Sequence, residues 1–164
     1  MQRKSGRDSG LYTLALACTR GREAIVENFR ALLHERDLTE QQWRVLRALH
    51  EHGAMDTPQL CETCCIHKVS MMRILRTLVE RRLVKRSVDR NDQRRHVVAI
   101  ASAGERIAQD MMPRTRAIYD AILSRLGREK ARQLARLLEE LAASAAPASA
   151  QASSSTLSRN LRKR

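Results

Sequence analysis

The fold is decided by residues 67–86, HKVSMMRILRTLVERRLVKR. Their apolar residues recur at helical spacing and predict an amphipathic helix from about Lys68 to Arg82, with a basic outer face. A short helical segment and a tight turn precede this helix, so the order is that of a helix-turn-helix. We expect the helix to bury Val69, Met72, Leu75, Leu78 and Val79.

Two further helices are expected before this stretch. Apolar residues at three- and four-residue spacing predict one long helix from Leu11 to about Leu33. A second helix begins at Thr39, because Thr39 and Gln42 have the spacing of a capping box. Gly53 ends it, since glycine adopts the left-handed backbone of a helix C-terminus at little cost.

The segments on either side of the basic helix complete a winged form of the motif. A short helix begins with Asp56 or Thr57 as its N-cap, and Pro58 lies in its first turn. After the basic helix, residues 83–87 and the β-branched run 96–100 predict two strands around a polar, basic loop. We therefore expect a β-hairpin wing next to the helix-turn-helix.

The C-terminal half is expected to be helical. Ser102 and Glu105 form a capping-box pattern for a helix to about Leu126, with Pro113 inside it and Gly127 at its end. A last helix carries an apolar seam, which suggests pairing of subunits. The seam consists of Ala131, Leu134, Leu138 and Leu141.

Charge indicates the class of partner. The chain has a net charge of +13, and residues 66–95 hold ten Lys or Arg against three acidic residues, so over half of the excess lies there. Such a surface attracts polyanions.

No apolar run could span a bilayer and Met1 to Gly10 lacks a signal peptide's apolar middle, so we expect a cytoplasmic protein. No catalytic or phosphate-cradling motif appears, so we expect neither enzyme activity nor a cofactor.

Three phrases resemble consecutive landmarks of the MarR family of winged-helix transcriptional regulators. They are LTEQQWRVLRAL (38–49), HKVSMMRILRTLVERRLVKR (67–86) and DRNDQRRHVVAIASAGERI (89–107), within a likeness that covers roughly residues 11–143. The first phrase is most similar to regulators of aromatic-acid degradation of the homoprotocatechuate type. Two positions depart from the family's pattern: Arg82 stands where Gly is usual, and Ala101 where Thr is usual.

The resemblance implies a mainly α homodimer with a small β-wing that binds double-stranded DNA as a ligand-released repressor. Its first and last helices would interdigitate. In domain terms, we expect a flexible segment 1–10, dimerisation segments 11–36 and 103–145, a DNA-binding lobe 38–101 and a disordered basic tail 146–164. Sequence-specific binding would distinguish the chain from a non-specific architectural DNA-binding protein, which remains an alternative.

The resemblance also implies DNA contacts from the basic helix and the wing. In the wing, an Asp at position 92 can fix the guanidinium of Arg94 for a phosphate or a narrow minor groove. Lys85, Arg86 and Arg95 are expected to position the DNA backbone. The alternative is a merely solvated basic face. The expected contacts are His67, Lys68, Ser70, Arg73 and Arg76 from the helix, and Lys85, Arg86, Arg90, Asp92 and Arg94 from the wing.

A site for a small aromatic carboxylate is expected on the second helix. Trp43 and Arg47 lie one turn apart and His50 continues that face, so an indole and a guanidinium could meet a ring and a carboxylate. Arg22 falls on the apolar stripe of the first helix and needs an anionic partner, which could be the ligand. Alternatively, Trp43 is a core residue and the arginines pair with Glu23 or Glu40.

The cysteines leave three interpretations open. Cys18, Cys61, Cys64 and Cys65 are expected to be reduced. The last three share a short helix and precede His67, so a thiol switch or a zinc site is conceivable, and a thiol-switched regulator is an alternative function. We favour structural packing and no bound metal, because a free cysteine behaves as a small apolar residue.

Overall fold

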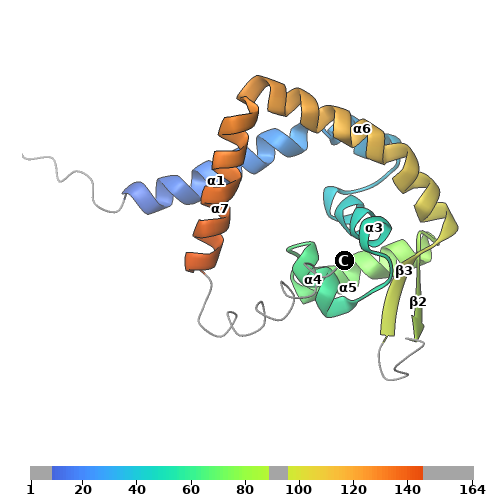
Figure 1. The fold of residues 1–164 in the computed structure, drawn as a ribbon. Helices are drawn as coiled ribbons and strands as arrows, with labels where there is room; N and C mark the ends of the chain where they lie inside the picture. Colours follow the sequence, from blue (N-terminus) through green and yellow to red (C-terminus); the bar gives the residue numbers. More distant parts are fainter. Residues whose placement is uncertain (1–8, 89–95, 146–164) are drawn as a thin grey trace, which may run out of the picture. The chain divides into compact units, whose positions relative to one another are not determined.

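The computed structural model describes residues 9–88 and 96–145 of the 164-residue chain (Figure 1). The described part divides between Tyr119 and Asp120 into two compact units, which we treat separately. The first unit holds a mainly helical core with a small sheet, as the sequence predicts. No helix within the described ranges is both long and apolar enough to cross a membrane.

The N-terminal helical segment is interrupted, contrary to the expectation of one long helix. Helix α1 spans Ser9–Glu27 and helix α2 spans Arg30–Glu35. At the break, the Asn28 side chain donates a hydrogen bond to the Ala24 carbonyl (2.7 Å), a local bond that competes with continuation of the helix. The break turns Phe29, Leu32 and Leu33 into the core, so burial of these side chains favours it.

Helices α3 and α4 begin at side-chain caps. In α3 (Glu40–His52), the Thr39 hydroxyl and the Gln42 side chain form the expected capping box, and Gly53 ends the helix with a φ of +78°. In α4 (Thr57–Thr63), Asp56 is the N-cap and forms a second capping box with Gln59. These caps confirm the predicted helix starts. The buried side chains of α3 are Trp43, Val45, Leu46, Ala48 and Leu49.

Helix α5 (Lys68–Glu80) lies where the sequence predicts it, but its buried face differs. Leu75 and Leu78 are buried as expected, together with Met71 and Ile74. Val69, Met72 and Val79 are instead exposed, by 77%, 43% and 37% of their surface. Apolar residues occur on two sides of this helix, and packing against α3, α4 and the sheet selects only one of them.

The sheet is antiparallel with strand order β1-β3-β2. The wing strands β2 (Val84–Val88) and β3 (His96–Ile100) match the predicted hairpin. Strand β1 (Met55–Asp56) pairs with β3 and was not predicted, because two residues carry no periodicity. Figure 1 shows α3, α4 and α5 gathered beside this sheet, so its inner face joins the core.

Helix α6 (Ser102–Leu126) starts differently from the prediction. Its first helical hydrogen bond runs from the Glu105 N–H to the Ala101 carbonyl (2.8 Å), so Ser102 is not the N-cap of a Ser102–Glu105 box. The Ala101 N–H donates in turn to the Leu83 carbonyl (3.0 Å), which fixes the start of α6 against the end of α5. The expected capping box is therefore wrong.

In the second unit, Gly127 separates α6 from α7 (Arg128–Ala145) with a φ of +89°. Helix α7 buries none of its residues within this protomer. Three leucines of the predicted seam are exposed, together with Leu137. Within the described residues of the second unit, the seam therefore lacks a covering surface.

Arg82 ends helix α5 in a left-handed conformation, with a φ of +56°. Its N–H donates to the Val79 carbonyl (2.9 Å) and the Leu83 N–H donates to the Leu78 carbonyl (2.9 Å), the two bonds of a Schellman motif. The residue is thus where the family pattern favours glycine, and it adopts glycine's conformation despite its Cβ. This geometry costs an L-residue roughly 1–2 kcal/mol.

We expect Arg82→Gly to raise the free energy of unfolding by about 0.5–1 kcal/mol, because relief of the left-handed strain exceeds the added entropy of the unfolded chain. Urea unfolding measures this change. Glu80→Gly is the matched control: position 80 is helical, so glycine there should lower stability by about 1 kcal/mol. Equal destabilisation by both glycines would contradict the prediction.

Candidate nucleic-acid interface and ligand pocket

The basic face of α5 forms a hollow together with the wing. Arg73 and Arg76 of α5 and Arg86 of β2 line it, and its volume is about 470 Å³. None of the described residues in the lining is acidic, so the guanidinium groups create a positive potential there. The other lining residues are apolar: Val69, Met72 and Val79.

The remaining predicted DNA contacts that fall on described residues are exposed. His67 is the N-cap of α5 without a side-chain cap bond, and His67, Lys68 and Ser70 are all exposed at the start of the helix. Lys85 is exposed but does not line the hollow, because successive residues of a strand point to opposite faces. Other predicted wing contacts lie outside the described residues: Arg90, Asp92, Arg94 and Arg95.

A smaller, mainly apolar pocket lies between α1, α2, α3 and α6, with a volume of about 100 Å³. Trp43, which is buried, and Arg47 both line it, as the sequence suggests. Tyr119 of α6 completes the pocket and packs against Phe29, with ring centroids 5.0 Å apart. Tyr119 was missed because 76 residues separate it from Trp43, and no local pattern links positions so distant.

Arg47 is a weakly paired cation in the lining of this pocket. Its Nε lies 3.8 Å from the Glu51 carboxylate, in an exposed pair one turn along α3. Such pairs contribute at most about 0.5 kcal/mol. The guanidinium can therefore exchange Glu51 for a ligand carboxylate at small cost.

The structure does not bring His50 and Arg22 to the pocket lining. His50 Nδ1 instead lies 2.9 Å from the Glu105 carboxylate of α6. Arg22 pairs with Glu40 (2.9 Å) and with Glu23 (3.5 Å), which is the alternative that the sequence left open. Arg22 can therefore influence the pocket only through Glu40, which lines it.

Arg44 was not singled out from the sequence, yet it joins the elements around the pocket. Its Nε donates to Glu40 (3.0 Å) and its Nη1 donates to the Cys64 carbonyl at the end of α4 (2.7 Å). Glu40 thus accepts hydrogen bonds from Arg22 of α1 and Arg44 of α3. These bonds fix one wall of the pocket.

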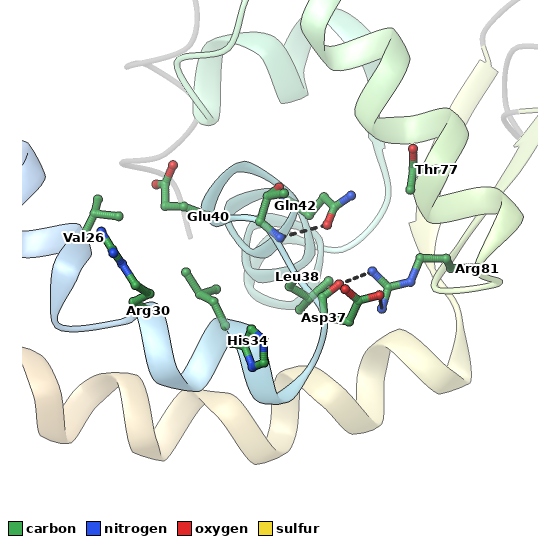
Figure 2. Close-up of a pocket in the computed structure, with 11 residues that line it drawn as sticks. Val26, Arg30, His34, Asp37, Leu38, Glu40, Gln42, Thr77 and Arg81 are labelled. Atoms are coloured by element: carbon green, nitrogen blue, oxygen red, sulfur yellow. Dashed lines mark hydrogen bonds and ion pairs between the residues drawn. The ribbon is translucent and has the colours of Figure 1, made fainter.

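A second hollow, of about 540 Å³, opens beside the α2–α3 turn. Figure 2 shows Thr77 of α5 and Arg81, the residue that follows this helix, on one side of it and Val26 and Arg30 on the other. Arg81 donates hydrogen bonds to the carbonyls of Asp37 and of Arg36, the latter at 3.1 Å. The end of the basic helix is therefore tied to the backbone of this turn.

Comparison with known proteins identifies the family. A family model described as MarR family matches residues 36–95. The HTH-type transcriptional regulator FarR of Neisseria gonorrhoeae is 38% identical over 118 residues, which cover 72% of this chain and 81% of FarR. The chain belongs to the MarR family. The resemblance inferred from the sequence is thereby confirmed.

Two further relatives of this MarR-family protein are informative. The homoprotocatechuate degradative operon repressor of Escherichia coli is 34% identical over 122 residues, covering 74% of this chain and 82% of the repressor. The crystal structure of NadR in complex with 4-hydroxyphenylacetate is 35% identical, with a TM-score of 0.67, and covers 87% of this chain and 96% of NadR. This likeness confirms the winged-helix fold class, and the chain is a MarR-family transcriptional regulator.

The cysteines of this MarR-family chain are placed mainly for packing. Cys64 is buried, and burial raises the pKa of its thiol to about 11. Burial also raises the pKa of Cys61, whereas Cys65 is exposed at a φ of +48°. A raised pKa lowers the fraction of reactive thiolate, which disfavours redox sensing or metal binding by Cys61 and Cys64. Within the described residues, no three His, Cys, Asp or Glu side chains are grouped to hold a metal ion.

We expect alkylation by iodoacetamide at pH 8 to modify Cys65 rapidly and Cys64 only on unfolding. With a pKa of about 11, only about one Cys64 thiol in a thousand is ionised at this pH, and the side chain is also inaccessible. Mass spectrometry after timed quenching measures both sites, and urea-unfolded protein provides the control. Equal native rates at the two positions would contradict this assignment.

Proposed function

We propose that this MarR-family protein is a cytoplasmic, homodimeric repressor that binds a pseudo-palindromic operator and is released by a small aromatic carboxylate. The observation that carries the proposal is the hollow that Arg73, Arg76 and Arg86 line together, with no acidic side chain among its described lining residues. Arginine can donate two hydrogen bonds to guanine in the major groove, or bind phosphate. A helix and a wing strand that share one such hollow suit adjacent parts of a duplex.

Dimerisation is supported by α7. Its seam residues Leu134, Leu138 and Leu141 are exposed in one protomer, and leucines at this spacing are favoured where a second helix covers them. In the proposed dimer, residues 11–36 and 103–145 join the subunits and residues 38–101 form each DNA-binding lobe. The two α5 helices would then enter major grooves about 34–36 Å apart.

The proposed effector site is the pocket of Trp43, Arg47 and Tyr119. Its rings and apolar walls suit an aromatic ring, while Arg47 suits a carboxylate. The names of two relatives support the proposed chemical class: one is a repressor of homoprotocatechuate degradation, and NadR was crystallised with 4-hydroxyphenylacetate. We therefore propose a hydroxylated phenyl carboxylate as the effector.

Release from DNA would be a shift between two spacings of the DNA-binding lobes. The pocket is lined by α1 and α2 of the proposed dimerisation segments and by α3 of the lobe. A ligand there changes DNA affinity only if it binds one spacing more tightly than the other. A tenfold loss of DNA affinity requires about 1.4 kcal/mol of such preference.

The test is binding of the purified protein to duplex DNA from its own upstream region, compared with a scrambled duplex at the same salt concentration. Fluorescence anisotropy is measured with and without 4-hydroxyphenylacetate and related carboxylates. We expect a preference for the upstream duplex that one of these acids abolishes. Equal affinity for both duplexes would overturn sequence-specific repression in favour of architectural DNA binding. Preference that responds to peroxide but to no acid would favour the thiol-switched alternative.

We expect Arg47→Gln to raise the concentration of effector needed for half-release by about 10- to 100-fold, because a hydrogen-bonded charge pair contributes about 1.5–3 kcal/mol. DNA affinity without effector should stay unchanged, because the pocket of Arg47 and the basic hollow share none of their described lining residues. Arg116→Gln on the exposed surface of α6 is the control and should respond to effector like the wild type. Unchanged effector sensitivity of Arg47→Gln would exclude this residue from the site.

A further inference from the structure

Val69 is an apolar side chain that the core does not explain. It is 77% exposed, more than any other large apolar residue in the ranges 13–88 and 96–145. It follows Lys68 at the start of α5, where every neighbouring side chain from His67 to Ser70 is exposed. An exposed valine in this polar setting is available to a partner that would cover it.

The position of Val69 on α5 shows which surface of the helix it belongs to. Met72 and Arg73 follow it by three and four residues and share its face of the helix. All three line the basic hollow, whereas Met71 and Leu75 lie on the opposite, buried face. Val69 therefore belongs to the same surface as the arginines that we propose for DNA binding.

The composition of this surface favours DNA over a protein partner. Among the described residues that line the hollow, three are arginines and none is acidic, and this excess of positive charge favours a polyanionic partner. A DNA major groove presents phosphates at its edges and one apolar group on its floor, the 5-methyl group of thymine. Residues at the N-terminal end of a recognition helix are those that reach base edges.

We propose that Val69 determines part of the sequence specificity by packing against the 5-methyl group of a thymine in each operator half-site, with Met72 beside it. This inference rests on the proposed function, since it assumes that α5 enters the major groove. The contact from Val69 would be apolar, in addition to the contacts that the three arginines make. The arginines would supply affinity and guanine contacts, whereas Val69 would distinguish thymine from cytosine.

The test removes only the methyl group. The upstream duplex is amplified with either thymidine or deoxyuridine triphosphate, because uracil keeps every hydrogen-bonding atom of thymine and lacks the 5-methyl group. Covering one methyl group changes affinity by about three- to fourfold, so two half-sites should give about tenfold weaker binding of the wild type to the uracil duplex. Val69→Ala should bind both duplexes with nearly equal affinity.

Val79→Ala is the matched control, because it makes the same truncation at the other end of the hollow. It should keep the wild-type ratio of thymine to uracil affinity. If wild type prefers its upstream duplex but ignores the methyl group, or if Val69→Ala keeps the full ratio, this inference is wrong and the proposed function stands. If wild type shows no preference over scrambled duplex, the proposed function itself fails.

Discussion

Gly104→Ala is expected to lower the free energy of unfolding by about 2–3 kcal/mol, as overpacking against rigid backbone does. A Cβ atom at this position would lie 2.2 Å from the Leu83 carbonyl oxygen and 3.0 Å from Ile100 Cγ1. The Leu83 carbonyl cannot simply move away, because it accepts a hydrogen bond from the N–H of Ala101, the residue that precedes α6. Helix α6 must therefore separate from the base of the wing.

Urea unfolding followed by circular dichroism measures this loss. Gly21→Ala is the matched control, because position 21 is also helical and a Cβ atom added there would meet nothing within 4 Å. Alanine there should raise stability by roughly 0.5–1 kcal/mol. Stability of Gly104→Ala within about 0.5 kcal/mol of the wild type would show that α6 approaches Leu83 less closely than the structure indicates.

Arg73→Ala is expected to weaken binding to the upstream duplex by about 100- to 1,000-fold. One bidentate base contact provides about 1–3 kcal/mol, and a homodimer loses it in both half-sites. The side chain is exposed and lines the basic hollow, so its removal should leave folding intact. Anisotropy titrations at several salt concentrations measure the affinity and its salt dependence.

The same titrations distinguish the two roles that Arg73 could have. Loss of a base contact lowers affinity for the upstream duplex more than for a scrambled one, whereas loss of a phosphate contact weakens both and reduces the salt slope. Arg116→Ala removes an equal charge from α6 and should change binding by less than about threefold. A comparably small effect of Arg73→Ala would remove α5 from the proposed interface.

Features that depend on neighbouring residues could be predicted from the sequence. Thr39 with Gln42, Gly53 and Asp56 mark helix ends through bonds to residues at most four positions away, and all three act as expected. The break at Asn28 was missed although its signal is local, since the apolar stripe continues through it. A stripe alone does not reveal whether the helix bends to bury it.

Features that depend on tertiary packing could not be predicted in the same way. Helix α5 has apolar residues at helical spacing on both faces, so the periodicity fits burial of Val69 and Met72 as well as burial of Met71 and Ile74. Only the position of α5 against α3 and the sheet decides between them. Tyr119 and Arg44 likewise acquire their roles from contacts between elements distant in sequence.

The attachment of the α2–α3 turn to α5 has a consequence for how the chain tolerates change. Arg81 donates to main-chain carbonyls of residues 36 and 37, not to their side chains alone. Every amino acid provides the same main-chain carbonyl, so substitutions of side chains in the turn can leave these two hydrogen bonds in place. These hydrogen bonds depend instead on Arg81, and no substitution within the turn would replace its guanidinium group.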